Sequence, residues 1–366
     1  MSDFLQIHLL TAYPPANLNR DDTGRPKTAV FGGATRLRIS SQSLKRAWRS
    51  SESFQTALRG NLADRTQRLG EEVRRHVLAK GIDPERALSI ARLIAAAFGS
   101  VKKENDKNPA YTEQLAFVSP QERAAAMELA ERLAGGDKLP KEIDAKTLLR
   151  AADTAVDIAM FGRMLADNPG FNREAAVQVA HAITTHRVTI EDDYYTAVDD
   201  LKRPEEDAGA GFVGEQAFGA GIFYLYICID RGLLVSNLGG GTEARDLGAK
   251  AIASLIKAAA TVGPRGKRAS FGSHARAHFV LVERGTSQPR TLAGAFLNPI
   301  GSEGENDFMR SSISALQNLR DDFDAAYGAD GVSNRSMQVG GSGSLAEITA
   351  FAAAEMPSGV QRPRPA

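Results

Sequence analysis

Apolar and polar positions follow different patterns along the chain, and each pattern predicts a different element. Residues 4–10 form an almost continuous apolar run, which is typical of a buried strand. Similar runs lie at residues 222–230 and 277–283. Between these two runs, residues 242–261 have the Ala, Leu and Ile content of a buried helix. Strands and a long helix therefore alternate in the second half of the chain.

A second helix is predicted over residues 40–53, directly after a short strand at 36–39. Either Ser40 or Ser41 is suited to cap this helix, because a side-chain hydroxyl can accept a hydrogen bond from the first turn. Its buried face is marked by apolar residues at three-and-four spacing, namely Leu44, Ala47 and Trp48.

Helical patterns predominate from about Asn61 to His186. Asp83-Pro84 is a helix start, and Ser119-Pro120-Gln121-Glu122 is a capping box with proline at the first helical position. From Arg187 to Gly221 the pattern changes to short β-prone runs around a segment rich in charge, proline and glycine, which predicts a long exposed β-hairpin.

These patterns predict an α+β protein with a ferredoxin-like core and two additions. The predicted units are a core formed by residues 1–57 and 222–355, an inserted helical domain at 58–186, a β-hairpin at 187–221 and a disordered tail at 356–366.

Composition sets limits on the class of protein. The chain has 366 residues and 43% hydrophobic content, enough for a large core. Cys228 is the one cysteine, which excludes a disulfide framework and favours a reducing compartment. We find neither a signal-peptide pattern nor an apolar stretch near the roughly 20 residues that span a bilayer. We therefore expect a cytoplasmic protein that does not contact a membrane.

The charge distribution is uneven, although the whole chain carries a formal charge of only +1. The first 50 residues contain eight Lys and Arg against three acids, a local charge of +5. Such a concentration of cations indicates a polyanion site. The cations are Arg20, Arg25, Lys27, Arg36, Arg38, Lys45, Arg46 and Arg49.

The predicted 40–53 helix offers unpaired N–H groups and the positive end of its dipole, both of which suit a phosphate. Lys45 and Arg49 share one helix face, and Gln42 and Arg46 share the next. The alternative is a solvated amphipathic helix with ordinary surface charges. The nearby glycine loop, which also carries Arg20 and Lys27, favours the phosphate site.

Several sequence blocks resemble the CasC family, the backbone subunit of the type I-E CRISPR Cascade surveillance complex. They appear in the family's order from the N-terminus to about residue 230. The blocks are Leu18-Asn19-Arg20-Asp21-Asp22, Phe31-Gly32-Gly33, the run from Arg38 to Ala47 (RISSQSLKRA), Gly162-Arg163-Met164, His181-Ala182-Ile183-Thr184-Thr185-His186 and Thr196-Ala197-Val198-Asp199-Asp200-Leu201.

The resemblance implies a hand-shaped protein with an RRM-like palm, helical fingers and a β-hairpin thumb. It implies a non-catalytic subunit without cofactors that polymerises along the guide RNA (crRNA). Its thumb would kink the guide at regular intervals, and the exposed bases would pair with target DNA. The implied partners are crRNA, target DNA through the guide duplex, further copies in a helical filament and other Cascade subunits.

The resemblance also assigns residues to the RNA site. The palm positions are Arg20, Lys27, Ser40, Gln42, Lys45, Arg46 and Arg49. Arg163 and Met164 would lie where fingers meet thumb, with Met164 wedged against unstacked bases, although a methionine near an apolar helix is more often core. Thr196 and Val213 are the thumb positions. The segment between Leu201 and Phe212 is longer and more acidic than the family pattern, and Val213 could instead pack on its cross-strand neighbour.

Lys138 and Lys141 lie in a predicted loop of the fingers, where lysines are usually solvated but can also contact duplex DNA without sequence preference. The same alternatives apply to Arg265, Lys267 and Arg268.

A metal site is not expected. His181 and His186 would face different sides of a helix, and His274 and His278 precede or enter a predicted strand. The competing hypothesis is a metal-dependent endoribonuclease that uses Asp21 and Asp22. Adjacent aspartates diverge, however, so we expect one of them to pair with an arginine and order the loop.

Overall fold

The computed structural model describes residues 3–136, 138–197, 212–301, 307–328 and 331–359. The strands are β1 Phe4–Ala16, β2 Thr28–Phe31, β3 Ala34–Ile39, β4 Asp64–Thr66, β5 Ala116–Val118, β6 Val177–Val179, β7 Ala182–Thr184, β8 Glu191–Ala197, β9 Phe212–Asp230, β10 Phe279–Gly285 and β11 Ser333–Gln338. The α-helices are α1 Ser41–Arg49, α2 Glu52–Ala57, α3 Leu69–Leu78, α4 Pro84–Ala95, α5 Pro120–Gly135, α6 Ala145–Leu148, α7 Val156–Phe161, α8 Arg231–Asn237, α9 Gly241–Thr261, α10 Arg268–Phe271, α11 Phe308–Tyr327 and α12 Leu345–Ala353. Short 3-10 helices are η1 Ala96–Phe98, η2 Pro169–Phe171 and η3 Ala293–Phe296.

A large antiparallel sheet organises the described part of the chain. Its strands follow the order β11-β10-β1-β9-β7-β3-β2, and β6 and β8 also pair with β9. The apolar run at the N-terminus forms an interior strand, in which Ile7 pairs with Ile227 of β9 on one side and Val282 of β10 on the other. The predicted α+β fold is confirmed as far as a mixed α/β protein with a large antiparallel sheet.

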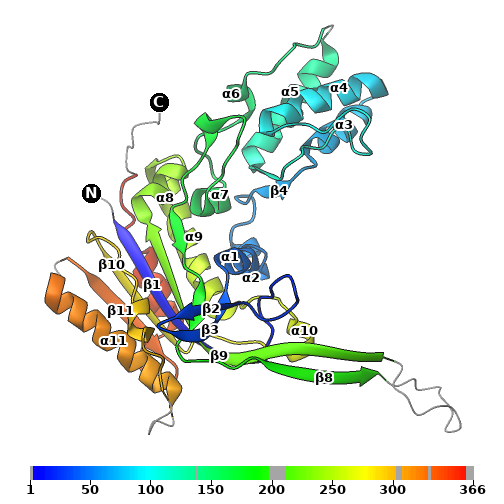
Figure 1. Ribbon diagram of the computed structural model, residues 1–366. Coiled ribbons are helices and arrows are strands. Elements are labelled where there is room, and N and C mark those ends of the chain that lie inside the picture. The colour runs from blue at the N-terminus through cyan, green and yellow to red at the C-terminus, as the bar shows by residue number, and fades with distance from the viewer. Residues whose placement is uncertain (1–2, 137, 198–211, 302–306, 329–330, 360–366) are drawn as a thin grey trace, which may run out of the picture.

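Helices cover both faces of the sheet (Figure 1). Residues of α1, α2, α8, α9 and α12 pack with alternate residues of β1, β9 and β10 in the largest hydrophobic core. On the other face, α11 and η3 pack around Leu10, Tyr224 and Phe279. The sheet is therefore a middle layer, and α1 is held to it by the buried side chains of Leu44 and Trp48.

The helical insertion has a separate hydrophobic core and lies away from the sheet (Figure 1). Its core is built mainly from α3, α4 and α5, with apolar residues of α6 and the short strand β5. Both helix starts identified in the sequence are present. Asp83 caps α4, and Ser119 and Glu122 form the reciprocal capping box of α5.

Two secondary-structure predictions were wrong. The helical segment does not extend to His186, because residues 177–179 and 182–184 are strands that pair with β9. The predicted 40–53 helix is two helices. Ser50 and Ser51 place their hydroxyls on the carbonyl oxygens of Arg46 and Trp48, and Ser51 caps α2, so local side-chain bonds end one helix and begin the next.

The predicted hairpin is formed by β8 and the first part of β9, and it projects from the sheet (Figure 1). The strand predicted at 222–230 is longer than expected, because β9 runs unbroken from the hairpin into the core. All of β8 is exposed. Residues 198–211, with the acidic segment, and residues 360–366 of the predicted tail lie outside the described residues.

Candidate nucleic-acid interface

The first turn of α1 is fixed by polar contacts that the sequence motif supplies. Ser40 is the N-cap, and its hydroxyl accepts a hydrogen bond from the backbone N–H of Ser43 at 3.4 Å. The backbone N–H of Ser40 donates to the Asn19 side-chain oxygen at 2.8 Å. Asn19 thereby ties the loop that carries Arg20 to the start of the helix. Ser40 itself is buried, so its contribution is to position the turn.

An open cavity of about 750 Å³ lies beside this turn. It brings together cations from three separate segments: Arg20 of the N-terminal loop, Arg46 of α1 and Arg265 of the α9–α10 loop. Arg20 and Arg46 are exposed, and the Arg265 guanidinium donates to the Ser50 carbonyl oxygen at 2.8 Å. Three guanidinium groups around one opening provide the fork geometry that phosphate groups fit.

Asp21 and Asp22 also line this cavity, but Asp21 is occupied in building the loop. Its carboxylate accepts hydrogen bonds from the Thr23 hydroxyl at 2.7 Å and from the backbone N–H groups of Thr23 and Arg25. These bonds, led by the one from Thr23, lower the pKa of Asp21. The expected pairing with an arginine is therefore replaced by an aspartate turn.

Lys45 and Arg49 share a face, as predicted, and that face lies against the base of the helical insertion. The Lys45 ammonium lies 5.9 Å from the centre of the Phe161 ring, and burial lowers its pKa. The Arg49 guanidinium lies 4.8 Å from the centre of the Phe117 ring and 3.5 Å from the carboxylate of Asp157. Gln42 and Arg46, on the neighbouring face, are exposed.

Asp157 joins three segments at this junction. Its carboxylate accepts a hydrogen bond from the backbone N–H of Ala63 at 2.8 Å and faces Arg49 on α1, while Asp157 itself belongs to α7. Burial raises its pKa to about 6, although the charge of Arg49 opposes this shift. The structure thus places a buried carboxylate where the helical insertion leaves and rejoins the sheet.

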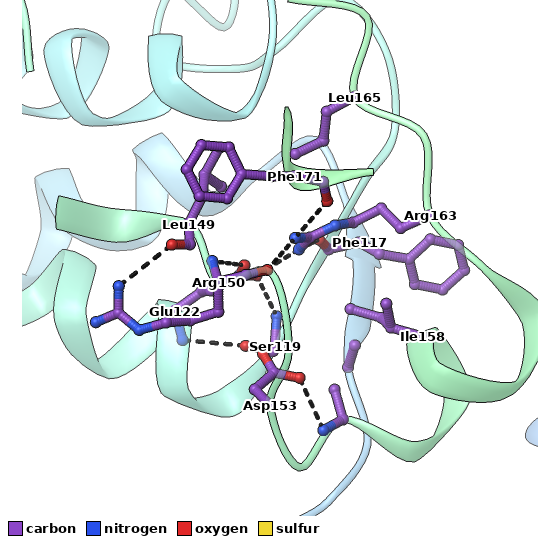
Figure 2. Close-up of polar contacts among 12 residues, drawn as sticks. Phe117, Ser119, Glu122, Leu149, Arg150, Asp153, Ile158, Arg163, Leu165 and Phe171 are labelled. Atoms are coloured by element: carbon purple, nitrogen blue, oxygen red, sulfur yellow. Dashed lines mark hydrogen bonds and ion pairs between the residues drawn. The ribbon is translucent and has the colours of Figure 1, made fainter. Parts of the chain in front are cut away.

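The three residues of the Gly162-Arg163-Met164 block have different structural environments. Gly162 has a φ of 80°, and a Cβ there would lie 3.0 Å from the Arg173 carbonyl oxygen. The Arg163 side chain is 1% exposed and donates to Glu122 at 2.6 Å, as well as to the carbonyl oxygens of Phe117, Arg150 and Phe171 (Figure 2). Met164 follows directly and is 83% exposed.

The prediction that Arg163 contacts RNA is corrected by this placement. Its guanidinium is buried and bonded to protein groups, so it anchors the segment and does not face solvent. Met164, by contrast, is not a core residue. The buried methionine of this region is Met160. A large apolar side chain is therefore displayed next to a buried ionic anchor.

On the hairpin, the register between β8 and β9 places Thr196 directly opposite Val213. Side chains of directly opposed residues lie on the same face of a β-ribbon. Both residues are exposed, with Val213 at 52%, and Tyr194 on the same face is 67% exposed. The hairpin is tied to the N-terminal loop by an ion pair of 2.9 Å between Arg25 and Asp192.

The remaining predicted residues lie elsewhere. Lys138 and Lys141 are exposed on the α5–α6 loop of the helical insertion and do not line the cavity beside α1. Lys27 is half-buried, and its carbonyl oxygen accepts a hydrogen bond from the backbone N–H of Arg38 at 2.8 Å. Arg38 in turn contacts His181.

The residues that the structure describes contain neither a metal cluster nor a membrane span. Within the described ranges, three or more His, Cys, Asp or Glu side chains do not gather in a way that could hold a metal ion. His181 and His186 flank strand β7, so the helix spacing used to evaluate them from the sequence does not apply. A helix that combines the length and the apolar content needed to span a bilayer is also absent from this part of the chain.

Sequence analysis missed the part that three residues play in this region. In the sequence, Asp157 stands out only as an acid within an apolar helix. His181 was noticed as part of a family block and as a rejected metal ligand, but not as a partner of Arg38. Arg265 was noticed as part of a basic loop, but its position near Arg20 depends on how the α9–α10 loop packs. In each case the partner lies more than 90 residues away.

Fold and surface together define a class: a mixed α/β protein with a helical insertion, a projecting β-hairpin and a cationic cavity beside α1. The family model of the CT1975-like proteins matches residues 5–358, so this chain belongs to that family. None of the curated proteins matches the chain.

Two solved structures have similar folds. One is a chain of a "CRISPR RNA-guided surveillance complex, pre-nicking", which is 30% identical, with a TM-score of 0.79 and coverage of 94% of this chain and 95% of that chain. The other, from a "CRISPR RNA-guided surveillance complex", is 24% identical, with a TM-score of 0.58 and coverage of 94% and 92%. The second likeness concerns the fold alone.

Arg163 and Met164 are adjacent residues with opposite environments, so they form a matched pair. Arg163→Ala leaves the Glu122 carboxylate buried without its cation, and we expect it to cost about 3–5 kcal/mol of stability. Met164→Ala removes an exposed side chain and is expected to stay within about 0.5 kcal/mol. Urea unfolding followed by circular dichroism tests this, and equal losses from the two changes would contradict the anchoring role.

The buried Asp157 carboxylate is expected to make stability depend on pH. Its pKa of about 6 exceeds the usual 3.8, so the folded protein binds a proton more tightly than the unfolded chain. The resulting stabilisation is complete below about pH 4 and is lost as the pH rises through about 6, a loss on the order of 3 kcal/mol. Asp157→Asn removes this ionisation. Unfolding profiles of the two proteins should therefore differ in slope between pH 4 and 7, and parallel profiles would contradict the assignment.

Proposed function

We propose that this chain is a guide-RNA-binding backbone subunit of a CRISPR surveillance complex of type I-E. The observation that carries the proposal is the gathering of Arg20, Arg46 and Arg265 around one cavity at the capped end of α1. Family membership and the 30% identical chain of a surveillance complex support it independently. The motif blocks that resemble the CasC family support the finer assignment to type I-E.

We assign the sheet to an RRM-like palm, the helical insertion to fingers and the β8–β9 hairpin to a thumb. The neighbouring strands β10-β1-β9-β7, with α1 and α9 packed on one face, follow the order of a ferredoxin-like core. The helical insertion has its own core, and the hairpin extends beyond the sheet, so both are able to reach a neighbouring subunit.

In this proposal the palm holds the ribose-phosphate strand and the other parts separate its bases. Arg20, Arg46 and Arg265 bind phosphates. Gln42 and Lys45 lie with Arg46 on helix α1. The described hairpin strands carry Glu191, Asp192, Asp193 and Glu215 without a lysine or arginine. Acids repel phosphate, so the hairpin contacts the strand through uncharged side chains such as Thr196 and Val213. Met164 is displayed to pack against an unstacked base.

The protein recognises the backbone of the guide, and base pairing with target DNA supplies sequence specificity. The proposed partners are crRNA, further copies in a helical filament, other Cascade subunits and target DNA, with Lys138 and Lys141 as weak DNA contacts. A filament needs heterologous contacts between copies, which a projecting hairpin can make. The proposed role is non-catalytic, needs no cofactor and belongs in the cytoplasm.

The charge-reversal variant Arg20→Glu/Arg46→Glu tests the palm site. Both side chains are exposed, so the fold should be unchanged while the phosphates meet two acids instead of two cations. We expect the variant to lose the RNA that co-purifies with the co-expressed complex, measured by the ratio of absorbance at 260 and 280 nm and by gel. In the milder Arg20→Ala/Arg46→Ala variant, the salt slope of RNA binding should fall by about 1.4.

Lys250→Glu provides the control, because Lys250 is exposed on α9 and does not line the cavity. Normal RNA retention by the Arg20/Arg46 reversal variant, with circular dichroism unchanged, would overturn the palm assignment.

The alternative function is a metal-dependent endoribonuclease using Asp21 and Asp22, which do line the cavity. Against it, the Asp21 carboxylate already accepts several hydrogen bonds in its own turn. Incubation of the complex with Mg²⁺ or Mn²⁺ and labelled complementary RNA is expected to leave the RNA intact. Cleavage that disappears in Asp21→Ala/Asp22→Ala would establish the nuclease and reject the non-catalytic role.

A further inference from the structure

The two histidines of the His181–His186 block have different surroundings. His186 is internally satisfied: one ring nitrogen lies 2.9 Å from the Arg187 carbonyl oxygen, and the other accepts the backbone N–H of Ile222 at 3.2 Å. His181 has one internal partner, Arg38, whose guanidinium donates to its Nδ1 at 2.8 Å. His181 is exposed, and its Nε2 has no partner among the described residues. The first histidine is therefore open to a ligand, and the second is structural.

Arg38 fixes the proton on His181. A guanidinium can only donate hydrogen bonds, so the Nδ1 of His181 must accept, and the proton of the neutral ring must be on Nε2. Burial, together with the nearby charges of Arg38 and Lys27, lowers the pKa of His181 and keeps the ring neutral near pH 7. The exposed side of His181 is therefore a single oriented N–H donor.

Arg38 also retains donors of its own. Its Nε donates to the Thr28 carbonyl oxygen at 3.2 Å and one Nη1 hydrogen goes to His181, which leaves three of its five N–H groups. Within the described part of the chain, neither Lys27 nor Arg38 forms an ion pair with an acid. Among the described residues, the Lys27 ammonium, the Arg38 guanidinium and this oriented N–H therefore lie near one another without an acidic counter-ion.

This group is continuous with the proposed palm site. Arg38 lies two residues before Ser40, the N-cap of α1, and its backbone N–H is bonded to the carbonyl oxygen of Lys27. Lys27 in turn donates its backbone N–H to Asn19, whose side chain holds Ser40. One hydrogen-bonded framework thus joins the Arg38–His181 pair to the first turn of α1.

We propose that Arg38 and His181 form a second contact point for the same ribose-phosphate strand, in which Arg38 binds a phosphate and orients His181 so that its Nε2–H donates to an adjacent phosphate oxygen. This inference rests on the proposed function and extends it. His181 acts as a neutral hydrogen-bond donor, whereas Lys27 and Arg38 supply the charge.

Side chains that mimic one ring nitrogen each provide the test. Glutamine can place its amide nitrogen near the position of Nε2, and asparagine can reproduce only the Nδ1 position. Full-length protein freed of nucleic acid is titrated into fluorescein-labelled single-stranded RNA, and affinity is measured by anisotropy over a range of salt. We expect His181→Gln to bind within about twofold of wild type and His181→Asn to bind at least about fivefold more weakly, both with an unchanged salt slope.

Arg38→Ala should weaken binding by about tenfold and lower the salt slope by about 0.7, because it removes a charge as well as the orientation of His181. Lys250→Ala controls for loss of an exposed cation elsewhere, and circular dichroism checks the fold. Wild-type protein that does not bind RNA would overturn the proposed function itself. Wild-type binding with Arg38→Ala or His181→Asn unchanged, or with Gln and Asn equally weak, would overturn this inference and leave the function standing.

Discussion

The pairing of β1 with β9 is the interaction on which the rest of the structure depends. β1 is an interior strand, and β9 is its neighbour over eleven register pairs from Phe4↔Asp230 to Ala16↔Gly219. Strands β6, β7 and β8 also pair with β9, so the last strands before the hairpin and the hairpin itself are ordered by the same element. β9 continues unbroken from the core into the hairpin, so the sheet sets the direction of the hairpin. The hairpin therefore needs no hydrophobic core of its own.

A second constraint acts where the helical insertion meets the sheet. Arg163 and Glu122 form a buried pair, and Asp157 connects α7 to Ala63 and Arg49. Removing one partner of a buried pair leaves an uncompensated charge, so such contacts favour one arrangement over its alternatives even when their net stabilisation is small. These contacts determine where Met164 is displayed and how Arg49 lies. In the proposed function, both positions affect how the nucleic acid is held.

The distribution of charge distinguishes the surface around α1 from the hairpin. Cations from three segments meet at the end of α1, and the Lys27–Arg38–His181 group continues that surface. The described hairpin strands are acidic and present Thr196, Val213 and Tyr194 to solvent. In the proposed function, a nearly neutral chain binds a polyanion at one surface and contacts it through uncharged side chains at another.

Much of this could be predicted from the sequence, because the information was local. The apolar runs at 4–10, 222–230 and 277–283 became β1, β9 and β10, and the cap at Ser40 and the capping box at Ser119 are in place. These features depend on side-chain periodicity and on hydrogen bonds across three or four residues. The excess of positive charge in the first 50 residues was also predictable, because it can be counted within one short segment of the sequence.

Only the tertiary structure decided which cations face solvent and which are used internally. Arg163 and Arg46 are both arginines in motif blocks, yet one is buried against Glu122 and the other lines the open cavity. Glu122, the partner of Arg163, is 41 residues away in the sequence. Similarly, His181 is 143 residues away from its partner Arg38. A local pattern specifies helices, strands and caps, but the fate of a charge depends on the burial and the counter-charges that distant segments bring to it.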